Sequence, residues 1–439
     1  MTDVLVVGAG PTGLTLALDL ARRGVAVRVI DQAPEPFGGS RGKGLQERSL
    51  EVLADLGVSA AIEAAAWQIP AKVYVNGRLE REITIGKVAV IPQWRVEAAL
   101  RDALAQHGVE VERSTPLTSF TAGDSGVVAN GTIEARYMVG CDGGRSAVRK
   151  QLGVPFEGTT EDRQLLVLAD AEVNGLSPDG SHMWVDPSLG VFVATPFKGL
   201  KQWQLVVGGP AAEGEPTPEL FETSFRRFTD LPDVTITNYT WMSKYRVNVR
   251  MVRRYRVGPV FLAGDAAHVH PPSGGLGMNT GIQDAYNLGW KLARAVAGTA
   301  SPGLLDTYEQ ERLPIAEWTL GTTNNALGSM RDAIEAGDSQ VTKGFRKDYD
   351  QLGLAYPDSP LSKNLTTWDG PVAGERAPWP KGPDFTLLCF GTQVDVPGVE
   401  TRVMPGSQGV LVLVRPDGHI GMVARPEDVK AIEDYVHRP

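Results

Sequence analysis

The stretch Asp3-Val-Leu-Val-Val-Gly-Ala-Gly-Pro-Thr-Gly13 decides the fold of this 439-residue chain. Its apolar strand leads into a glycine-rich turn, a helix follows from Leu14 to Arg23, and a second strand from Val25 to Ile30 ends at Asp31. The glycines permit a tight turn, a close approach of backbone to pyrophosphate, and close packing of helix on strand, while the acid accepts hydrogen bonds from ribose. The unit predicts an ADP-binding α/β fold, with a βα turn that binds no ligand as the alternative.

A second informative stretch, GDAAHVHPPSGGLGMNTGIQDAYNL from Gly264 to Leu288, lies more than 250 residues downstream. The apolar run Pro259–Ala263 before it predicts a buried strand, so Asp265 falls at a strand end. Three glycines then precede an amphipathic helix that begins near Met278, and the free N–H groups of a helix start attract negative charge. Together the two stretches predict a flavin dinucleotide held at its two ends by distant parts of the chain.

Composition is typical of a large, soluble, cytoplasmic enzyme with two or three domains. No apolar run approaches the ~18 residues that a membrane-spanning helix needs, and a net charge of −9 argues against nucleic-acid partners. Cys141 and Cys389 lie in strand-like runs and are expected to be free and buried. The residues Met1-Thr-Asp3 lead directly into the first strand, which predicts no secretory leader.

The order of predicted elements indicates an α/β protein in which one domain is interrupted by another. Residues 1–163 and 250–366 are expected to form a Rossmann-like FAD-binding domain with a helical extension. Alternating apolar residues between 164 and 249 predict an inserted β-sheet substrate domain with one helix at Pro218–Phe228. Residues 367–439 predict a short α/β module, in which the Pro/Gly/Trp-rich part up to Pro383 is expected to be a linker.

Three motifs give the chain its resemblance to the single-component FAD aromatic hydroxylases, the family of para-hydroxybenzoate hydroxylase. They are Gly8–Gly13, Asp142-Gly-Gly-Arg-Ser-Ala-Val-Arg149 and Gly264-Asp-Ala-Ala-His-Val-His-Pro-Pro272. The chain is most similar to the branch that acts on polyketides and antibiotics, which includes aklavinone-type hydroxylases and rifampicin monooxygenase. The resemblance covers Met1 to about Ala336, and the C-terminal piece resembles a shortened form of that branch's thioredoxin-like domain.

The resemblance implies a bound FAD, NADPH or NADH as a transient reductant, O2, and hydroxylation of a bulky aromatic or polyketide substrate through a flavin C4a-hydroperoxide. Asp31 would bind the adenosine ribose and Asp265 the ribityl chain. Arg41 and Pro272 are assigned to catalysis, and the glycines around Arg41 predict a hinge that lets the flavin move toward the nicotinamide. Further positions that the resemblance assigns to cofactor binding are Gly8, Gly10, Thr12, Gly13, Gln32, Gln93, Thr118, Asp142, Arg149, Gly277, Met278 and Asn279.

The chemistry gives independent reasons for some of these residue types. A reduced flavin carries negative charge at its pyrimidine end, which a helix start near Gly277 would stabilise without a charged side chain. A flavin peroxide is lost to water, so the pocket over the ring must be apolar and closable. The sheet insertion is expected to form its roof. The candidate lining residues are Trp184, Phe192, Trp203 and Trp241, with ordinary core positions as the alternative.

Several alternatives remain open at this point. The same peroxide could serve Baeyer–Villiger or decarboxylative oxygenation, and a flavin-binding carrier or sensor would keep the fold without turnover. His268 and His270 lack the partners of a metal site, so no metal is expected, and no general base for a phenol can be assigned. Monomer and homodimer are both compatible with the sequence. A basic cluster predicts a solvated surface or a site that steers a phosphorylated nicotinamide, and comprises Arg246, Arg250, Arg253, Arg254 and Arg256.

Overall fold

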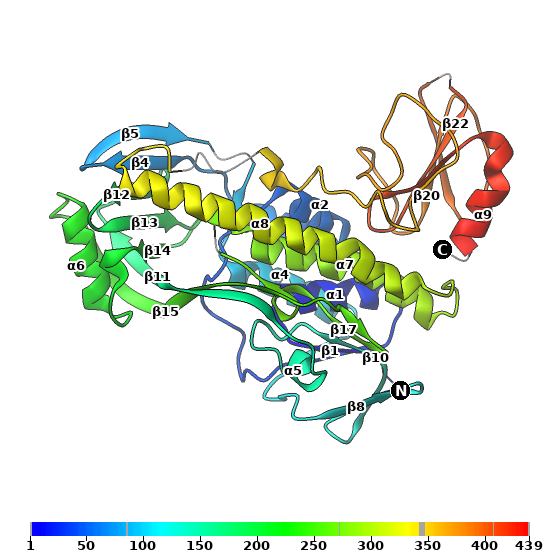
Figure 1. The fold of residues 1–439 in the computed structure, drawn as a ribbon, viewed down its shortest axis with the longest axis horizontal. Coiled ribbons are helices and arrows are strands. Elements are labelled where there is room, and N and C mark those ends of the chain that lie inside the picture. The colour runs from blue at the N-terminus through cyan, green and yellow to red at the C-terminus, as the bar shows by residue number, and fades with distance from the viewer. Residues whose placement is uncertain (1, 85–86, 272, 342–346, 407, 438–439) are drawn as a thin grey trace.

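The computed structural model describes residues 2–84, 87–271, 273–341, 347–406 and 408–437. Figure 1 shows a sheet near the N-terminus, a second sheet beside one end of a long helix, and a C-terminal module on the other side of the molecule. Mixed sheets and helices make an α/β fold, as the sequence predicts.

The strand of the glycine-rich fingerprint, β1 (Thr2–Val7), lies inside an eight-stranded sheet. It pairs in parallel with β2 (Val27–Ile30) and with β10 (Ile133–Gly140). A parallel strand covered on both faces is apolar at nearly every position, and Val4–Val7 are all buried. The sheet order is β16-β17-β10-β1-β2-β7, and the other strands are β7 (Val111–Glu112), β8 (Phe120–Gly123), β9 (Gly126–Ala129), β16 (Arg256–Val257) and β17 (Val260–Leu262).

Helix α1 (Pro11–Arg22) follows the fingerprint and packs against α4 (Gln93–Gln106) and α7 (Leu276–Val296). Most of α7 is buried, because α1, α2 (Glu47–Asp55) and α8 (Thr307–Glu335) all contact it. This helix therefore connects the N-terminal cofactor segment to the downstream one. The shorter helices of this region are α2, α3 (Ser59–Ala65) and α5 (Ala147–Gln151).

The second sheet also has eight strands, in the order β18-β15-β11-β14-β13-β12-β4-β5. Its two long strands, β11 (Glu157–Asn174) and β15 (Thr235–Met251), pair over most of their length. Three strands from outside the expected insertion join it. At one edge β4 (Ala71–Val75) pairs in parallel with β12 (Ser181–Asp186) and antiparallel with β5 (Arg78–Ile83), and at the other edge β18 (His268–Val269) pairs with β15. The remaining strands are β13 (Gly190–Pro196) and β14 (Gln202–Gly208), and a small separate sheet joins β3 (Gly44–Leu45) to β6 (Ala89–Val90).

The two faces of this second sheet carry different side chains. Trp184, Phe192 and Trp203 belong to one buried cluster, together with Phe221 and Phe225 of α6 (Pro218–Phe228). Residues one position away along the strands point to the opposite face, because side chains alternate along a strand. On that face Val191, Val193 and Val206 cluster with Met330 and Ile334 of α8. One face is thus an aromatic core and the other a smaller aliphatic surface.

The C-terminal module is a five-stranded sheet with one helix on it. The segment 367–383, expected to be a linker, packs onto this sheet instead. Trp368 and Trp379 lie 5.0 and 5.1 Å from the ring of Phe390 between centroids, and the Ala377 amide donates to the carbonyl of Gly418. Proline and glycine here produce an irregular backbone that is hydrogen-bonded to the sheet but only partly buried. The elements are β19 (Lys363–Asn364), β20 (Thr386–Phe390), β21 (Glu400–Met404), β22 (Val410–Val414), β23 (Ile420–Ala424) and α9 (Val429–His437).

A buried ionic cluster joins this module to the long helices. Arg415 forms a bidentate pair with Glu311 of α8, with Nη1–Oε1 and Nη2–Oε2 distances of 2.7 and 2.9 Å. Lys291 of α7 lies 2.7 Å from the same carboxylate, and Asp417 accepts a hydrogen bond from Trp290. Breaking a buried pair of this kind leaves a charge without a partner. The cluster therefore holds the module against α7 and α8.

Both cysteines are free and buried, as predicted. Burial raises the pKa of the Cys141 thiol well above its usual value, so this thiol stays uncharged. Within the described part of the chain, no helix combines the length and apolar character needed to cross a bilayer.

Candidate active site

A single continuous cavity of about 1720 Å³ joins the glycine-rich turn to the second sheet. Its lining runs from Gly8 and Asp31 at one end, past Asp265 and the start of α7, to Val193 of the sheet. Sites for one small molecule measure roughly 300–1,000 Å³. The cavity therefore has room for a dinucleotide cofactor and for a second molecule beside it.

The fingerprint glycines have three different surroundings. A Cβ on Gly8, whose φ is +105°, would lie 2.4 Å from the carbonyl oxygen of Cys141, and a Cβ on Gly13 would lie 2.0 Å from that of Gly8. A Cβ on Gly10 would meet nothing within 4 Å. Gly8 and Gly13 are thus required by protein packing, whereas Gly10 leaves open space in the cavity. No described side chain caps the start of α1 at Gly10, so its first amides are free to bind an anion.

Asp31 stands at the end of β2, where the fingerprint requires an acid. Its Oδ2 accepts from the Ala9 amide at 2.7 Å and its Oδ1 from the Ala33 amide at 2.8 Å. These two bonds fix the carboxylate beside the turn while it lines the cavity. Gln32 and Thr12 line the same end, so the local structure fits the sugar and phosphates of a dinucleotide.

The start of α7 forms the middle of the cavity wall. Its N-cap, Gly275, has a left-handed φ of +63°, and no described side chain caps the helix there. Gly277 and Met278 line the cavity. Asn279 is fully buried instead, and its amide group bonds the backbone of Gln46, Gly44 and Gly275 at 2.7–3.0 Å. Asn279 therefore positions the helix start against the opposite wall rather than facing the cavity.

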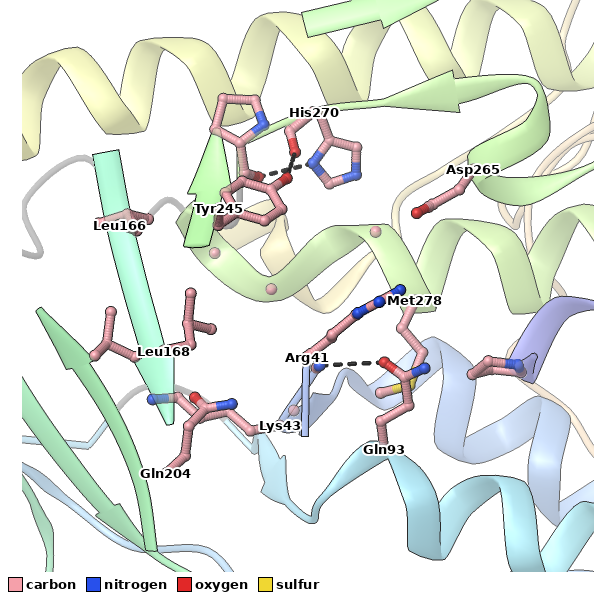
Figure 2. Close-up of a pocket in the computed structure, with 18 of the residues that line it drawn as sticks. Arg41, Lys43, Gln93, Leu166, Leu168, Gln204, Tyr245, Asp265, His270 and Met278 are labelled. Carbon is pink, nitrogen blue, oxygen red and sulfur yellow. Dashed lines mark hydrogen bonds between the residues drawn. The ribbon is translucent and has the colours of Figure 1, made fainter. Parts of the chain in front are cut away.

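Asp265 extends its carboxylate into the cavity from the turn before β18 (Figure 2). Loss of solvation in the cavity wall raises the pKa of Asp265, while its interactions with His268 and with the Arg41 guanidinium lower it in part. Tyr245 also lines the cavity, and its hydroxyl donates to the backbone carbonyl of His270 at 3.0 Å. Burial lowers the pKa of His270 to about 4, so this ring is neutral at physiological pH.

The 38–44 loop crosses the cavity and is fastened on both sides. The Ser40 amide donates to Asp170 Oδ2 at 2.8 Å, and Gln204 Nε2 lies 3.1 Å from the Ser40 hydroxyl. On the other side, the Gly42 amide donates to Gln93 Oε1 at 3.2 Å. Figure 2 shows Arg41 reaching from this loop toward α7, in the direction of Asp265.

The family to which these features point is shown by comparison with known proteins. The family model described as an FAD binding domain matches residues 1–323. A flavin-dependent monooxygenase of Mycobacteroides abscessus is 36% identical over an alignment that covers 99% of each chain. The chain belongs to the family of FAD-binding monooxygenases.

Other relatives agree with this assignment. The 6-methylpretetramide 4-monooxygenase of Streptomyces rimosus is 36% identical, over 95% of this chain and 80% of that protein. A solved ternary complex of aklavinone-11 hydroxylase with FAD and aklavinone has a TM-score of 0.84 and 27% identity, covering 100% of this chain and 98% of the other. The monooxygenase is therefore a flavin-dependent aromatic monooxygenase that binds FAD, which confirms the resemblance inferred from the three motifs.

The two ends of the motif Asp142–Arg149 have different roles. Asp142 lines the cavity and accepts from the Ser146 hydroxyl at 2.5 Å and the Ala147 amide at 2.6 Å. Arg149 does not line the cavity. It is buried over the ring of Phe156 and donates to the carbonyl of Ala266 at 2.9 Å. Arg149 therefore holds the turn that carries Asp265, and its predicted contact with the cofactor stays a prediction.

One predicted cofactor position lies away from the cavity. Thr118 is exposed, and its amide and hydroxyl both bond Asn130 Oδ1, at 2.9 and 3.0 Å. The neighbouring residues Thr115 and Leu117 line the cavity in its place, because the strand order brings β7 and the turn after it beside β2. Pro272 lies outside the described residues.

The predicted aromatic lining is wrong for this cavity. Trp184, Phe192 and Trp203 point to the α6 face of the sheet, and Trp241 packs its ring 5.7 Å from that of Phe37 between centroids. The register of the strands, and not the presence of aromatic residues, decides which side chains face the cavity. The sheet residues that line the cavity include Leu166, Leu168, Ser181, Met183, Val191, Val193, Thr195, Gln204 and Val206.

The remaining sequence features have structural explanations. His268 Nε2 lies 2.8 Å from Asp284, which also accepts from Arg312 at 2.7 Å. Among the described residues, no group of His, Cys, Asp and Glu is arranged to hold a metal ion. In the basic cluster, Arg253 pairs with Glu157 and Glu317, and Arg256 with Asp306, which favours a surface held by ion pairs.

Proposed function

We propose that this monooxygenase hydroxylates a bulky, polycyclic aromatic substrate of the polyketide class, with NADPH or NADH as reductant. The observation that carries the proposal is the single cavity that joins the dinucleotide turn to an aliphatic face of the sheet. A cavity of about 1720 Å³ exceeds what one cofactor-sized or drug-sized molecule alone needs. The names of two relatives, which act on 6-methylpretetramide and aklavinone, support the same substrate class.

The residues at the dinucleotide end would bind FAD mainly through backbone. The free amides after Gly10 would bind the pyrophosphate and Asp31 the ribose. Asp265 and Gln93 would bind the part of FAD nearer the ring, and the amides at the start of α7 would stabilise negative charge on it. Bound FAD, once reduced by the nicotinamide, supplies the activation of molecular oxygen.

The residues at the sheet end would hold the substrate and keep water away from the reacting atoms. Leu166, Leu168 and Val193 provide an apolar wall, and exclusion of water protects reactive oxygen species from side reactions. We infer that Arg41 orients the cofactor from the 38–44 loop, because it faces Asp265 and has no ion-pair partner among the described residues.

We also infer a division of the chain into an FAD-binding part, a substrate-binding sheet and a shortened thioredoxin-like module over 367–439. The sheet would comprise residues 164–249 with additional strands from 71–83. In the module, β20 pairs in parallel with β21 and antiparallel with β22, and α9 follows β23. This arrangement supports a thioredoxin-like module without the first helices of that fold.

The test is turnover by the FAD-loaded enzyme with a panel of aromatic polyketides that includes aklavinone. We expect substrate to stimulate NADPH or NADH consumption, and the product to carry one atom from 18O2 as a ring hydroxyl. Insertion of that atom into a carbon–carbon bond would show Baeyer–Villiger chemistry instead. A reconstituted protein that binds FAD but shows no stimulated consumption with any aromatic compound would contradict the proposal.

A further inference from the structure

Lys43 places an ammonium group at the sheet end of the cavity. Figure 2 shows its side chain beside Gln204 and Leu168, whereas Arg41 extends from the same loop toward α7. The Lys43 Nζ donates to the Thr195 hydroxyl at 2.9 Å, and that oxygen lies 2.7 Å from the Ser181 hydroxyl. The Lys43 ammonium group is therefore held at a defined point of the cavity wall, where it would face a bound substrate.

No carboxylate of the described residues forms an ion pair with Lys43. The charge of Asp170 acts on Lys43 electrostatically, but the two oxygens of Asp170 accept from the Ser40 amide and hydroxyl. Burial lowers the pKa of Lys43 to about 8, and the charge of Asp170 offsets only part of this effect. A cation in such surroundings gains stability from an anionic partner.

Apart from Gln204, the sheet side chains that line this part of the cavity are mostly apolar. They include Leu166, Leu168, Met183 and Val206, which line the same wall as the polar group formed by Lys43, Thr195 and Ser181. In small-molecule sites, a few polar groups in an otherwise apolar wall fix the orientation of the ligand. An aromatic ring system would contact the aliphatic side chains, and one of its oxygens would meet the ammonium group.

We propose that Lys43 and Thr195 bind an ionised phenol or enol oxygen of the substrate, so that the enzyme selects acidic aromatic compounds and orients them by that oxygen. The inference rests on the proposed function and specifies its substrate class. The proton leaves the phenol for solvent, and the oxygen keeps the electron pair. An ionised oxygen enriches the ortho and para carbons in electron density, which favours their attack on an electrophilic oxygen atom.

The test measures binding to the oxidised, FAD-loaded enzyme without turnover. The two probes are 2-hydroxyanthraquinone, whose visible absorption changes when its phenol ionises, and 2-methoxyanthraquinone, which cannot ionise. We expect the enzyme to lower the apparent pKa of the bound phenol by about one unit or more. It should also bind the ionised phenol roughly ten- to a hundredfold more tightly than the methoxy compound.

The variant Lys43→Met removes the charge and keeps most of the side-chain length. It should return the phenol pKa to that of the free probe, while binding of the methoxy probe changes less than about twofold. Lys43→Arg should retain most of the shift, and Thr195→Val should lose part of it. The matched control is Lys72→Met on β4, which removes a lysine paired with Asp179 outside the cavity and should leave both probes unaffected.

An unchanged phenol pKa in Lys43→Met, with normal FAD content, would overturn the proposal, as would equal binding of both probes or of neither by the natural enzyme. If Lys43→Met does not fold, Thr195→Val still gives the comparison with Lys43→Arg, and a full phenol pKa shift in Thr195→Val would overturn the proposal. Ionised phenol bound at Lys43 without any stimulated NADPH consumption would instead contradict the proposed function and leave this site standing.

Discussion

At the dinucleotide end of the cavity the chain presents backbone, whereas at the sheet end it presents side chains. The first end depends on glycines whose missing Cβ atoms permit close packing or leave open space, as at Gly13 and Gly10. The second end depends on which side chains of a strand face inward, as with Val193 and not Phe192. Backbone recognition follows from a short local motif, but side-chain recognition follows from the register of a whole sheet.

The largest expected effect separates two glycines of the same turn. Gly13→Ala would place a methyl group 2.0 Å from the Gly8 carbonyl oxygen, where no flexible side chain can move aside. We expect loss of the folded FAD-binding part, at a cost of about 5 kcal/mol or more. Gly10→Ala has open space and a φ of −79° that alanine adopts freely, so the apoprotein should keep its stability.

Measurements of urea unfolding and of FAD affinity distinguish these outcomes. Gly10→Ala should lower the affinity for FAD roughly ten- to a hundredfold, because its methyl group occupies the space that the pyrophosphate approaches. Equal stability of the two variants would contradict the distinction between Gly13, which protein packing requires, and Gly10, which leaves space for the ligand. Unchanged FAD affinity in Gly10→Ala would show that the pyrophosphate does not bind beside Gly10.

A second pair of variants tests the two faces of the sheet. Phe192→Ala empties a position packed between Trp184 and Phe225, and should cost about 3–5 kcal/mol in the free energy of unfolding. Val193→Ala, the next residue on the strand, faces the cavity and should cost on the order of 1 kcal/mol. Thermal unfolding gives the stabilities, and binding of 2-methoxyanthraquinone should change only in Val193→Ala. A binding change confined to Phe192→Ala would reverse the assignment of the faces.

Sequence reasoning predicted the elements better than it predicted the lining of the cavity. The helix Pro218–Phe228 begins and ends where expected, and Gly10, Asp31, Asp142 and Asp265 all reach the cavity. These residues lie in or beside turns at strand ends, where local sequence determines geometry. The aromatic residues of the sheet were predicted as candidate lining because large rings suit an aromatic ligand, but such rings also make the best core.

The error at Thr118 and the unexpected strands of the second sheet have related causes. Thr118 follows directly after Leu117, which lines the cavity, and no local signal indicates where a chain leaves a sheet edge. The strands at 71–83 join the second sheet through pairing with β12, which lies about a hundred residues away. Pairing over such a separation leaves no pattern within either segment. Lys43 escaped notice for the same reason, because only the fold brings it to Thr195.

The smallest expected effect concerns the side chain of Glu97, at the dinucleotide end of the cavity. Glu97 is buried beside the dinucleotide turn, and its Oε1 accepts from Gln93 Nε2 at 2.8 Å. Burial raises the pKa of Glu97 to about 6, and the charge of Asp31 acts in the same direction. The folded state therefore holds this proton more tightly than the unfolded state does, so the stabilising contribution is fully present below about pH 4.5 and is lost as pH rises through about 6.

Glu97→Gln keeps a neutral group of the same shape at every pH. Relative to the natural apoprotein, it should gain up to about 2 kcal/mol in unfolding free energy at pH 8, and the gain should disappear at pH 4.5. Asp102→Asn, at an exposed position of the same helix α4, serves as the control in urea titrations at both pH values. An ionised Glu97 also repels the pyrophosphate, so FAD affinity at pH 8 should rise in Glu97→Gln. A gain that persists unchanged at pH 4.5 would show that Glu97 affects stability through packing and not through its charge. The charge at the dinucleotide end of the cavity would then come from backbone groups alone.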